Sequence, residues 1–333
     1  MRIKFFSGYG YESRKEQSMS LTSLLTFDKN IKALFATIPN MKVHFQNVDG
    51  GDPFPTNPVQ IVPRKHSTAG LIGHAYDYLL RAYVQKINGV HQEQTAEELA
   101  AFAGLERWST SDAHLNARFA SIIEHRNRYI NGQVELDDIL LQDSLVLAHL
   151  ESYYRSGYMD VQGPLNVVDA DIVDLRSLIK ATQERQSLFI AERGVVCNPS
   201  FGRAIAGLVG GADGDLILDD MLIEIKVESS FKYAIRHLRQ LIGYWILSCL
   251  TPDFHPQIDR LGIWNPRYCR MVYITVEDIC RAMDMRAFTE QFIDVLSQGS
   301  VGAGNIGAVM NKQRMEEIRA LWDRPDQPIR QLY

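Results

Sequence analysis

The stretch GGADGDLILDDMLIEIKV, residues 210–227, contains two short apolar runs separated by a pair of aspartates. The runs at 216–218 and 221–227 have the length and apolar content of β-strands. Asp219 and Asp220, between the runs, are residues that favour a tight turn. The stretch therefore predicts a β-hairpin, and the sequence on either side of it indicates which kind of sheet the hairpin joins.

Three charged side chains of this hairpin are expected to meet at one edge of the sheet. Side chains alternate across a strand, so Glu224 and Lys226 project from the same face, and the turn brings Asp215 beside Glu224. Two carboxylates can hold Mg²⁺ or Mn²⁺ and leave positions for water and phosphate. The carbonyl of Ile225 is a further candidate ligand. Asp213 is the alternative first carboxylate, but Asp215 directly precedes the apolar run and is preferred.

The sequence around the hairpin predicts a short sheet flanked by helices. After about residue 187, runs of β-type residues alternate with amphipathic stretches, which is typical of an α/β or α+β core. The predicted strands cover 187–197, 214–218, 221–227, 258–265 and 270–276, with a turn at Pro266-Arg267. The predicted helices cover 230–250, 276–298 and 308–322.

Upstream of this core the sequence reads first as a loop and then as helices. Residues 46–65 are rich in glycine and proline, and Ser67-Thr68 can then cap a helix over 69–87. From 94 to 157 apolar residues recur at helical spacing, and nothing in this block looks catalytic. The predicted divisions are an N-terminal segment (1–66), a core helix (67–90), a helical insertion or cap (91–163), and the core with its C-terminal helices (164–333).

The helix predicted after the hairpin carries a polar stripe. Lys232, Arg236, Gln240 and Tyr244 follow one another at intervals of four residues, which places them on one helical face. Cations and hydrogen-bonding groups beside a carboxylate pair suit a phosphate backbone, and Arg239 is a further candidate contact. An ordinary amphipathic helix with a solvated basic face has the same pattern, so both interpretations stay open at this point.

The hairpin residues resemble the signature of a known group of enzymes. Asp215, followed about nine residues later by Glu224-x-Lys226, resembles the motif of the PD-(D/E)xK phosphodiesterase superfamily. Gly214 stands where the motif has proline, a change that the superfamily tolerates. Alone the motif is weak, because Glu-x-Lys is common on half-exposed strands, where it forms surface ion pairs of about 0–1 kcal/mol.

Two accessory patterns also resemble the RecB-like branch of that superfamily. Gln240-x-x-x-Tyr244 is similar to its Q-x-x-x-Y element, and Gly70-x-x-x-His74 is similar to its GxxxH element. In that branch the histidine is an additional metal ligand. The resemblance covers residues 70–81 and roughly 197–275.

The helix that contains His74 has two further charged residues near the same face. Asp77 and Arg81 follow His74 at i+3 and i+7, where they can act beside the metal or contact substrate. An imidazole suits Mn²⁺ better than Mg²⁺. A lone helical histidine is more often structural, so His74 as a ligand and His74 as a packing residue are both kept.

The resemblance implies a restriction-endonuclease-like core with a helical insertion, and a metal-dependent nuclease activity with DNA as the favoured substrate. It implies metal binding by Asp215 and Glu224 and a catalytic cation at Lys226, with Gln240 and Tyr244 positioning the site. It also implies a setting in bacterial DNA processing or defence, where a separate helicase or ATPase subunit would open the strands. The alternative is an inactive nuclease-fold subunit that binds nucleic acid or scaffolds a complex.

Composition and charge narrow the other possibilities. The net charge of −5 means that a nucleic-acid site must be a local basic groove, because salt screens charges beyond about 8–10 Å. No Walker loop, GxSxG elbow or HExxH element occurs. We expect no membrane span or signal peptide, and hence a cytoplasmic protein. The four cysteines have no CxxC or Cys/His spacing, so we expect buried, reduced thiols and no iron–sulfur cluster: Cys197, Cys249, Cys269 and Cys280.

Overall fold

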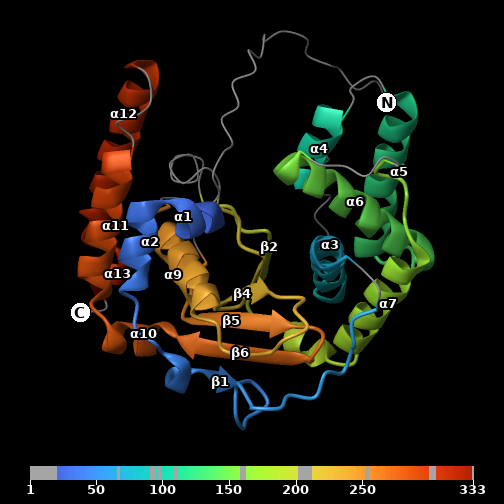
Figure 1. The fold of residues 1–333 in the computed structure, drawn as a ribbon, viewed down its shortest axis with the longest axis horizontal. Coiled ribbons are helices and arrows are strands. Elements are labelled where there is room, and N and C mark those ends of the chain that lie inside the picture. Colours follow the sequence, from blue (N-terminus) through green and yellow to red (C-terminus); the bar gives the residue numbers. More distant parts are fainter. Residues whose placement is uncertain are drawn as a thin grey trace.

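The chain folds as a mixed α/β structure in which helices cover both faces of a mixed sheet (Figure 1). The sheet has six strands within the part of the chain that the structure describes. The computed structural model describes residues 21–65, 68–90, 95, 99–108, 112–157, 163–201, 212–251, 256–299 and 305–331.

The strands lie in the order β1-β6-β5-β4-β3-β2. Neighbours are antiparallel except β4 and β5, which run parallel because the helix α9 (Ile235–Cys249) connects them. The sheet therefore consists of two antiparallel groups, one formed by β2, β3 and β4 and the other by β5, β6 and β1. The two groups meet at the parallel pair β4 and β5. The strand bounds are β1 (Gln46–Asn47), β2 (Val195–Cys197), β3 (Leu216–Leu218), β4 (Met221–Ile225), β5 (Arg260–Asn265) and β6 (Arg270–Thr275).

The predicted hairpin is present as β3 and β4. Leu218 pairs with Met221, so the connection is the two-residue turn that the sequence indicates. Asp219 adopts a φ of 55°, a left-handed conformation that aspartate tolerates better than most residues. Its carboxylate also accepts the backbone N–H of Arg193 at 2.6 Å, which fixes the neighbouring loop against the turn.

One face of the sheet packs on α9 and on helices from both ends of the chain. Strand residues Ile217, Leu222 and Ile263 point to this face and are almost fully buried. Phe35 contacts the rings of Phe288 and Phe292 edge-on, which joins the N-terminal and C-terminal helices. The other helices here are α1 (Leu21–Phe27), α2 (Lys29–Ala36), α10 (Val276–Ala282), α11 (Met285–Gly299), α12 (Asn305–Trp322) and α13 (Pro328–Gln331).

The opposite face packs on α3, α6 and α7 through the alternate strand residues, among them Ile223 and Ile225. Trp264 donates its indole N–H to the Tyr76 hydroxyl at 2.8 Å, which ties β5 to α3. The helices α4 and α5 form a separate apolar cluster against α3 and α6 (Figure 1). Their bounds are α3 (Ala69–Ile87), α4 (Ala100–Trp108), α5 (Ala113–Ile130), α6 (Asp138–Ser156) and α7 (Asp169–Gln183).

The helical character predicted for 94–157 is present in the described part of that block, as α4, α5 and α6. Close packing holds the block together: a Cβ on Gly104 of α4 would lie 1.9 Å from the carbonyl oxygen of Leu150 in α6. The predicted cap of α3 is only partly present. Thr68 is the N-cap residue but makes no side-chain capping bond, and Ser67 lies outside the described residues.

The strand predicted over 187–197 is wrong for most of its length. Gln186–Phe189 is a short 3-10 helix, and the strand is confined to Val195–Cys197. Phe189 explains the difference, because its ring is fully buried and packs edge-on against Trp264. The segment therefore contributes one buried ring to the core rather than the alternating side chains of a strand. Tertiary packing here overrides a local β preference.

The helix predicted over 276–298 is two helices, α10 and α11. Met283 is extended, and the Asp284 carboxylate accepts the backbone N–H of Ala287 at 2.9 Å, as an N-cap does. This cap competes with continued helix, because it satisfies a backbone donor only when a new helix begins. The single-helix prediction missed this aspartate.

Candidate active site

A pair of facing carboxylates lies at the end of the β3–β4 hairpin. Leu216 pairs with Ile223, so the register sets Asp215 opposite Glu224. Asp215 Oδ2 accepts the backbone N–H of Ile225 at 2.6 Å, and Glu224 is 4% exposed. Burial and the facing charge of Glu224 together raise the pKa of Asp215 to about 7. The two facing carboxylates therefore repel each other, and the surrounding groups of the protein offset this repulsion only in part.

The remaining candidates for the first carboxylate and for the backbone ligand lie differently. Asp213 is exposed and forms an isolated bridge with Ser200, two residues before the position that faces Glu224. The contact that Ile225 makes with the site is through its N–H rather than through the predicted carbonyl. The geometry favours Asp215 as the partner of Glu224.

Lys226 joins the carboxylate pair, as its position on the strand predicts. Its Nζ lies 2.6 Å from Glu224 Oε1 and 3.2 Å from Gln240 Oε1. Burial acts against the charge of Lys226, but Glu224 and Asp215 outweigh burial and raise its pKa. Lys226 is therefore an ammonium group that donates hydrogen bonds, and it cannot serve as a base near neutral pH.

Gln240 and Tyr244 support the lysine from α9. Gln240 Nε2 lies 3.2 Å from the Tyr244 hydroxyl and 3.3 Å from Thr22 Oγ1. Its own oxygen accepts from Lys226, so the amide is fixed in one orientation. Both side chains are buried, at 8% and 6% exposure. They are placed to hold Lys226 in position, and no pattern in the sequence predicts that Thr22 joins them.

The predicted polar stripe on α9 is wrong at its first member. The helix begins at Ile235, so Lys232 lies in the extended segment before it and shares no helical face with Gln240. Phe231 and Tyr233 account for this late start, because they pack into an aromatic cluster with Phe54. Lys232 itself is exposed.

The two arginines predicted to contact phosphates, Arg236 of the stripe and the further candidate Arg239, lie in different surroundings. Arg236 is exposed and pairs with Glu228 at 3.0 Å, whereas Arg239 donates to the carbonyl of Ala36 in α2 at 3.3 Å. Glu228 also lies 3.3 Å from His237 Nε2. Hydrogen bonding from His237 lowers the pKa of Glu228 to about 2, although burial acts in the opposite direction. The basic groups are therefore dispersed around the start of α9.

The helix α3 brings a second charged group next to the hairpin. Asp77 and Arg81 form a buried ion pair, and the charge of Asp215 acts on both of them. Burial, together with the negative charges of Asp215 and Glu151, raises the pKa of Asp77 to about 7 against the effect of Arg81. The predicted proximity of Asp77 and Arg81 to the site is therefore present.

His74 lies on the same helix but its contact is with α6. Its Nδ1 is 3.4 Å from Oε1 of Glu151, which is 4% exposed. The same carboxylate oxygen also binds Arg155 at 2.7 Å. Sequence reasoning missed both α6 residues. The available signal was Glu151 within the apolar run LVLAHLESYYR, four residues before Arg155.

Each carboxylate of the pair keeps one oxygen for a ligand. Glu224 Oε2 and Asp215 Oδ1 accept no hydrogen bond from the described residues. In that same part of the chain, no three His, Cys, Asp or Glu side chains form a group that could hold an ion, so His74 does not join the pair in one. Two carboxylates fit Mg²⁺, which takes water and phosphate oxygens as its remaining ligands.

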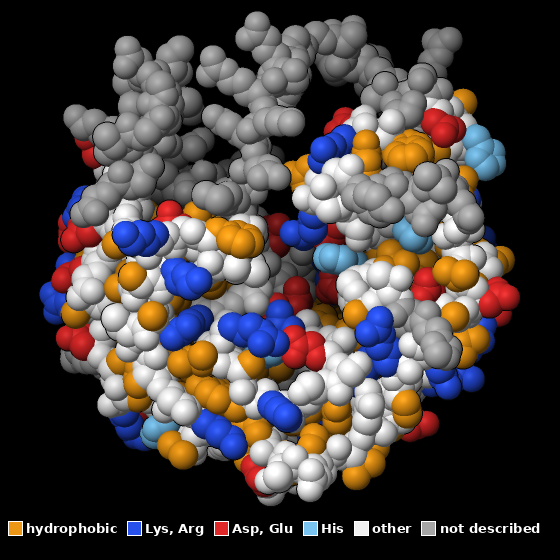
Figure 2. Space-filling model, viewed as in Figure 1, with side chains coloured by type: hydrophobic (Ala, Val, Ile, Leu, Met, Phe, Trp, Pro, Cys, Tyr) orange, Lys and Arg blue, Asp and Glu red, His pale blue; other side chains and the backbone are white. Residues whose placement is uncertain are grey.

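The site opens to one side of the molecule. Figure 2 shows this face hollowed between the part formed by α1, α9 and β4 and the part formed by α3 and α6. Acidic side chains lie deep in the hollow, with Lys or Arg and His side chains beside them. The elements at its border carry the carboxylate pair, Lys226 and the His74–Glu151 contact. A charged ligand can therefore approach the pair from this side.

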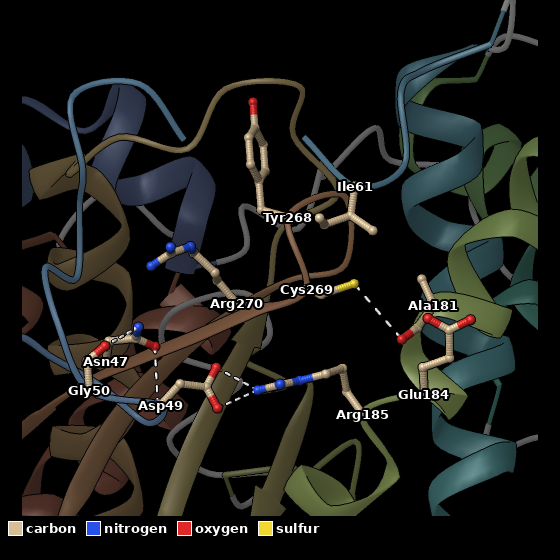
Figure 3. Close-up of a pocket in the computed structure, with 10 residues that line it drawn as sticks. All are labelled: Asn47, Asp49, Gly50, Ile61, Ala181, Glu184, Arg185, Tyr268, Cys269 and Arg270. Atoms are coloured by element: carbon tan, nitrogen blue, oxygen red, sulfur yellow. Dashed lines mark hydrogen bonds and ion pairs between the residues drawn. The ribbon is translucent and has the colours of Figure 1, made fainter. Parts of the chain in front are cut away.

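A second depression, of about 430 Å³, is separate from these groups (Figure 3). It lies beside β1, the β5–β6 turn and the C-terminal end of α7. Its polar wall includes the ion pair of Asp49 and Arg185, and Cys269 Sγ lies 3.8 Å from the carbonyl oxygen of Ala181. No predicted site residue lines it.

Two further expectations concern the whole chain. Within the described residues, no helix combines the length and the apolar character that a membrane crossing requires. No disulfide joins the four cysteines, and each is of intermediate exposure rather than buried as predicted.

Comparison with family models, with characterised proteins and with solved structures finds no match to this chain.

Proposed function

We propose that this protein is a metal-dependent nuclease of the PD-(D/E)xK type, with a RecB-like arrangement, which hydrolyses phosphodiester bonds in nucleic acid and favours DNA. The observation that carries the proposal is the meeting of Asp215, Glu224 and Lys226 at the end of one hairpin, whose strand β4 borders the hollowed face in Figure 2. A mixed sheet flanked by helices is also the core that the resemblance implies.

The protein groups have distinct roles in this proposal. Asp215 and Glu224 would hold Mg²⁺ or Mn²⁺ through the oxygens that accept no hydrogen bond from the described residues. When bound, the cation supplies Lewis acidity and lowers the pKa of a coordinated water. Lys226 donates hydrogen bonds and stabilises the negative charge that develops on the phosphate.

The support around Lys226 favours catalysis over a surface ion pair. An exposed Glu–Lys pair leaves a flexible lysine in water and contributes about 0–1 kcal/mol. Here Lys226 is fixed by both Glu224 and Gln240, and Gln240 is fixed in turn by Tyr244. A catalytic cation needs such preorganisation, because it stabilises the transition state most when it is already in position before negative charge develops on the phosphate.

A cleavage assay tests the proposal. Purified protein is incubated with supercoiled, linear and single-stranded DNA, and with RNA, in Mg²⁺, Mn²⁺ or chelator. We expect cutting that needs the cation and is lost in Glu224→Gln and Lys226→Gln. Glu277→Gln is the control, because Glu277 is an exposed acid of α10 in a surface pair with Arg281. Cutting that survives chelator, or that persists in both site variants, would contradict the proposal.

The alternative is an inactive subunit that keeps this fold and binds nucleic acid or scaffolds a complex. The presence of both carboxylates together with the lysine favours the enzyme, since an inactive relative has no need for two acids that face each other beside a lysine. Tight DNA binding without cutting under any metal condition would favour the alternative.

A further inference from the structure

The helical block contributes a buried acid that holds two basic groups beside the hairpin. Glu151 lies in α6 and is 4% exposed, which is rare for a glutamate unless it is paired. Its Oε1 lies 2.7 Å from both Nε and Nη2 of Arg155 and 3.4 Å from Nδ1 of His74. Burial acts against its charge, but His74 and Arg155 outweigh burial and lower the pKa of Glu151.

Arg155 differs from the other arginine of this region in how open it is. Its side chain is 53% exposed, whereas that of Arg81 is 7% exposed and is closed by Asp77. Arg155 also interacts electrostatically with groups of the hairpin side, namely Asp213 and Tyr244. One edge of its guanidinium is therefore anchored by Glu151, and the rest faces solvent close to the catalytic hairpin.

We propose that Arg155 binds a backbone phosphate of the nucleic-acid strand in the hollow, with Glu151 as the positioning residue that holds it there. The assignment rests on the proposed nuclease function and gives the helical block a role in it. A guanidinium matches phosphate because its planar array of donors makes two parallel hydrogen bonds. Anchoring by Glu151 reduces the side-chain entropy that such binding would otherwise lose.

A plain surface ion pair at spacing i,i+4 is the competing explanation for Arg155. Such pairs join two exposed side chains and stabilise a helix only weakly. In this pair the acid is buried and is shared with His74 from another helix, so its position is fixed by tertiary contacts. A surface pair would not need that arrangement.

Binding measured without cleavage tests the assignment. A fluorescent oligonucleotide, single- or double-stranded, is titrated in chelator over a series of salt concentrations. We expect Arg155→Gln to weaken binding about tenfold. The slope of the logarithm of the binding constant against the logarithm of the salt concentration should also fall by about one, as for the loss of one phosphate contact. Arg319→Gln is the matched control, since Arg319 is also 53% exposed and pairs with an acid, Asp294, on the C-terminal helices. It should bind as the unchanged protein does.

Two further variants separate a phosphate contact from a structural role. Arg155→Lys keeps the charge but lacks the planar fork, so it should keep the salt dependence and lose part of the affinity. Glu151→Gln should raise the KM for cleavage and leave kcat unchanged, because it loosens Arg155 and not the hairpin. A fall in kcat at constant KM in Glu151→Gln would contradict the positioning role.

The failure of this assignment can be told apart from failure of the proposed function. If the unchanged protein cuts DNA in a metal-dependent way and Arg155→Gln binds as tightly as Arg319→Gln, only the assignment of Arg155 is overturned. If the unchanged protein neither binds nor cuts nucleic acid, both are overturned.

Discussion

Two buried charge clusters of this fold differ in how well their charges balance. Asp174 of α7 and Arg267, which follows β5, form a two-point pair at 3.0 and 2.9 Å, with both side chains at most 1% exposed. At the hairpin, Lys226 contacts Glu224, which faces Asp215, and the other cation that acts on Asp215 is Arg81, which is already paired with Asp77. One cluster is neutral and sealed, and the other carries excess negative charge and opens into a hollow.

This difference indicates what each cluster does. The carbonyl of Arg267 accepts the N–H groups of Ile61 and Val62 at 2.8 and 2.9 Å, so the neutral pair fixes a loop to the sheet. A neutral pair whose side chains are at most 1% exposed cannot be reached by a ligand. Excess negative charge in a buried site costs stability, and a bound cation would offset that cost. We therefore propose a structural role for the first cluster and cation binding for the second.

The largest effect should come from breaking the neutral pair. Asp174→Ala leaves the buried guanidinium of Arg267 without its carboxylate, so the free energy of unfolding should fall by about 3–5 kcal/mol. Urea denaturation followed by circular dichroism measures this change. Adding Arg267→Met should restore part of the loss, because it removes the unpaired charge. An unchanged midpoint in Asp174→Ala would show that the pair does not hold the fold.

Next in size is the loss of activity at the hairpin without loss of fold. Glu224→Gln removes half of the carboxylate pair, and we expect the cleavage rate to fall by about 10²–10³-fold, as for one lost electrostatic contact at a reacting centre. The free energy of unfolding, measured by urea denaturation, should stay within about 1 kcal/mol of the original. If Glu224→Gln destabilised the protein as much as Asp174→Ala does, the two clusters would share a structural role.

A smaller effect, of opposite sign, is expected at Asp215. The folded-state pKa of about 7 lies above the ordinary value of 3.8, so ionised Asp215 opposes folding at higher pH. Stability should therefore fall as pH rises from about 4 through about 7. Asp215→Asn lacks this loss and should be more stable above pH 7, on the order of 1–3 kcal/mol. Thermal unfolding in chelator across this pH range measures it, and equal pH profiles would contradict the excess of negative charge.

The smallest effect should appear in acid, at Glu228. Its pKa is lowered to about 2 by His237 and Arg236, so its contribution is complete above about 4.5 and is lost as pH falls through about 2. Glu228→Gln should lack this part of the acid destabilisation. Because Glu228 is 37% exposed, solvent screening limits the difference to at most about 1 kcal/mol. Acid titration of the two proteins compares them, and an identical loss of stability would show that these contacts are too weak to matter.

The hairpin could be predicted from sequence because every contact that defines it is local. Strand alternation fixes the face of Glu224 and Lys226, and a two-residue turn fixes Asp215 opposite Glu224. The accessory pair Gln240 and Tyr244 also lies where its motif implies, at hydrogen-bonding distance from Lys226 or from each other. Short sequence separation made these positions predictable.

The parts that were missed depend on contacts between distant segments. Glu151 meets His74 only because α6 packs on α3, and no periodicity in either helix indicates that pairing. The helix α9 starts later than predicted because Phe231 and Tyr233 pack against Phe54, far upstream in the chain. Helical spacing describes a face, and only tertiary structure decides where that face begins.

Titration of Mn²⁺ by calorimetry tests the central claim most directly, because it measures the cation without requiring a substrate. We predict that the unchanged protein and the surface variant Glu277→Gln bind Mn²⁺ alike, and that Asp215→Asn and Glu224→Gln each weaken binding by at least about tenfold. Equal Mn²⁺ affinity in all four proteins, or no binding in any of them, would contradict the claim that the facing carboxylates form a cation site.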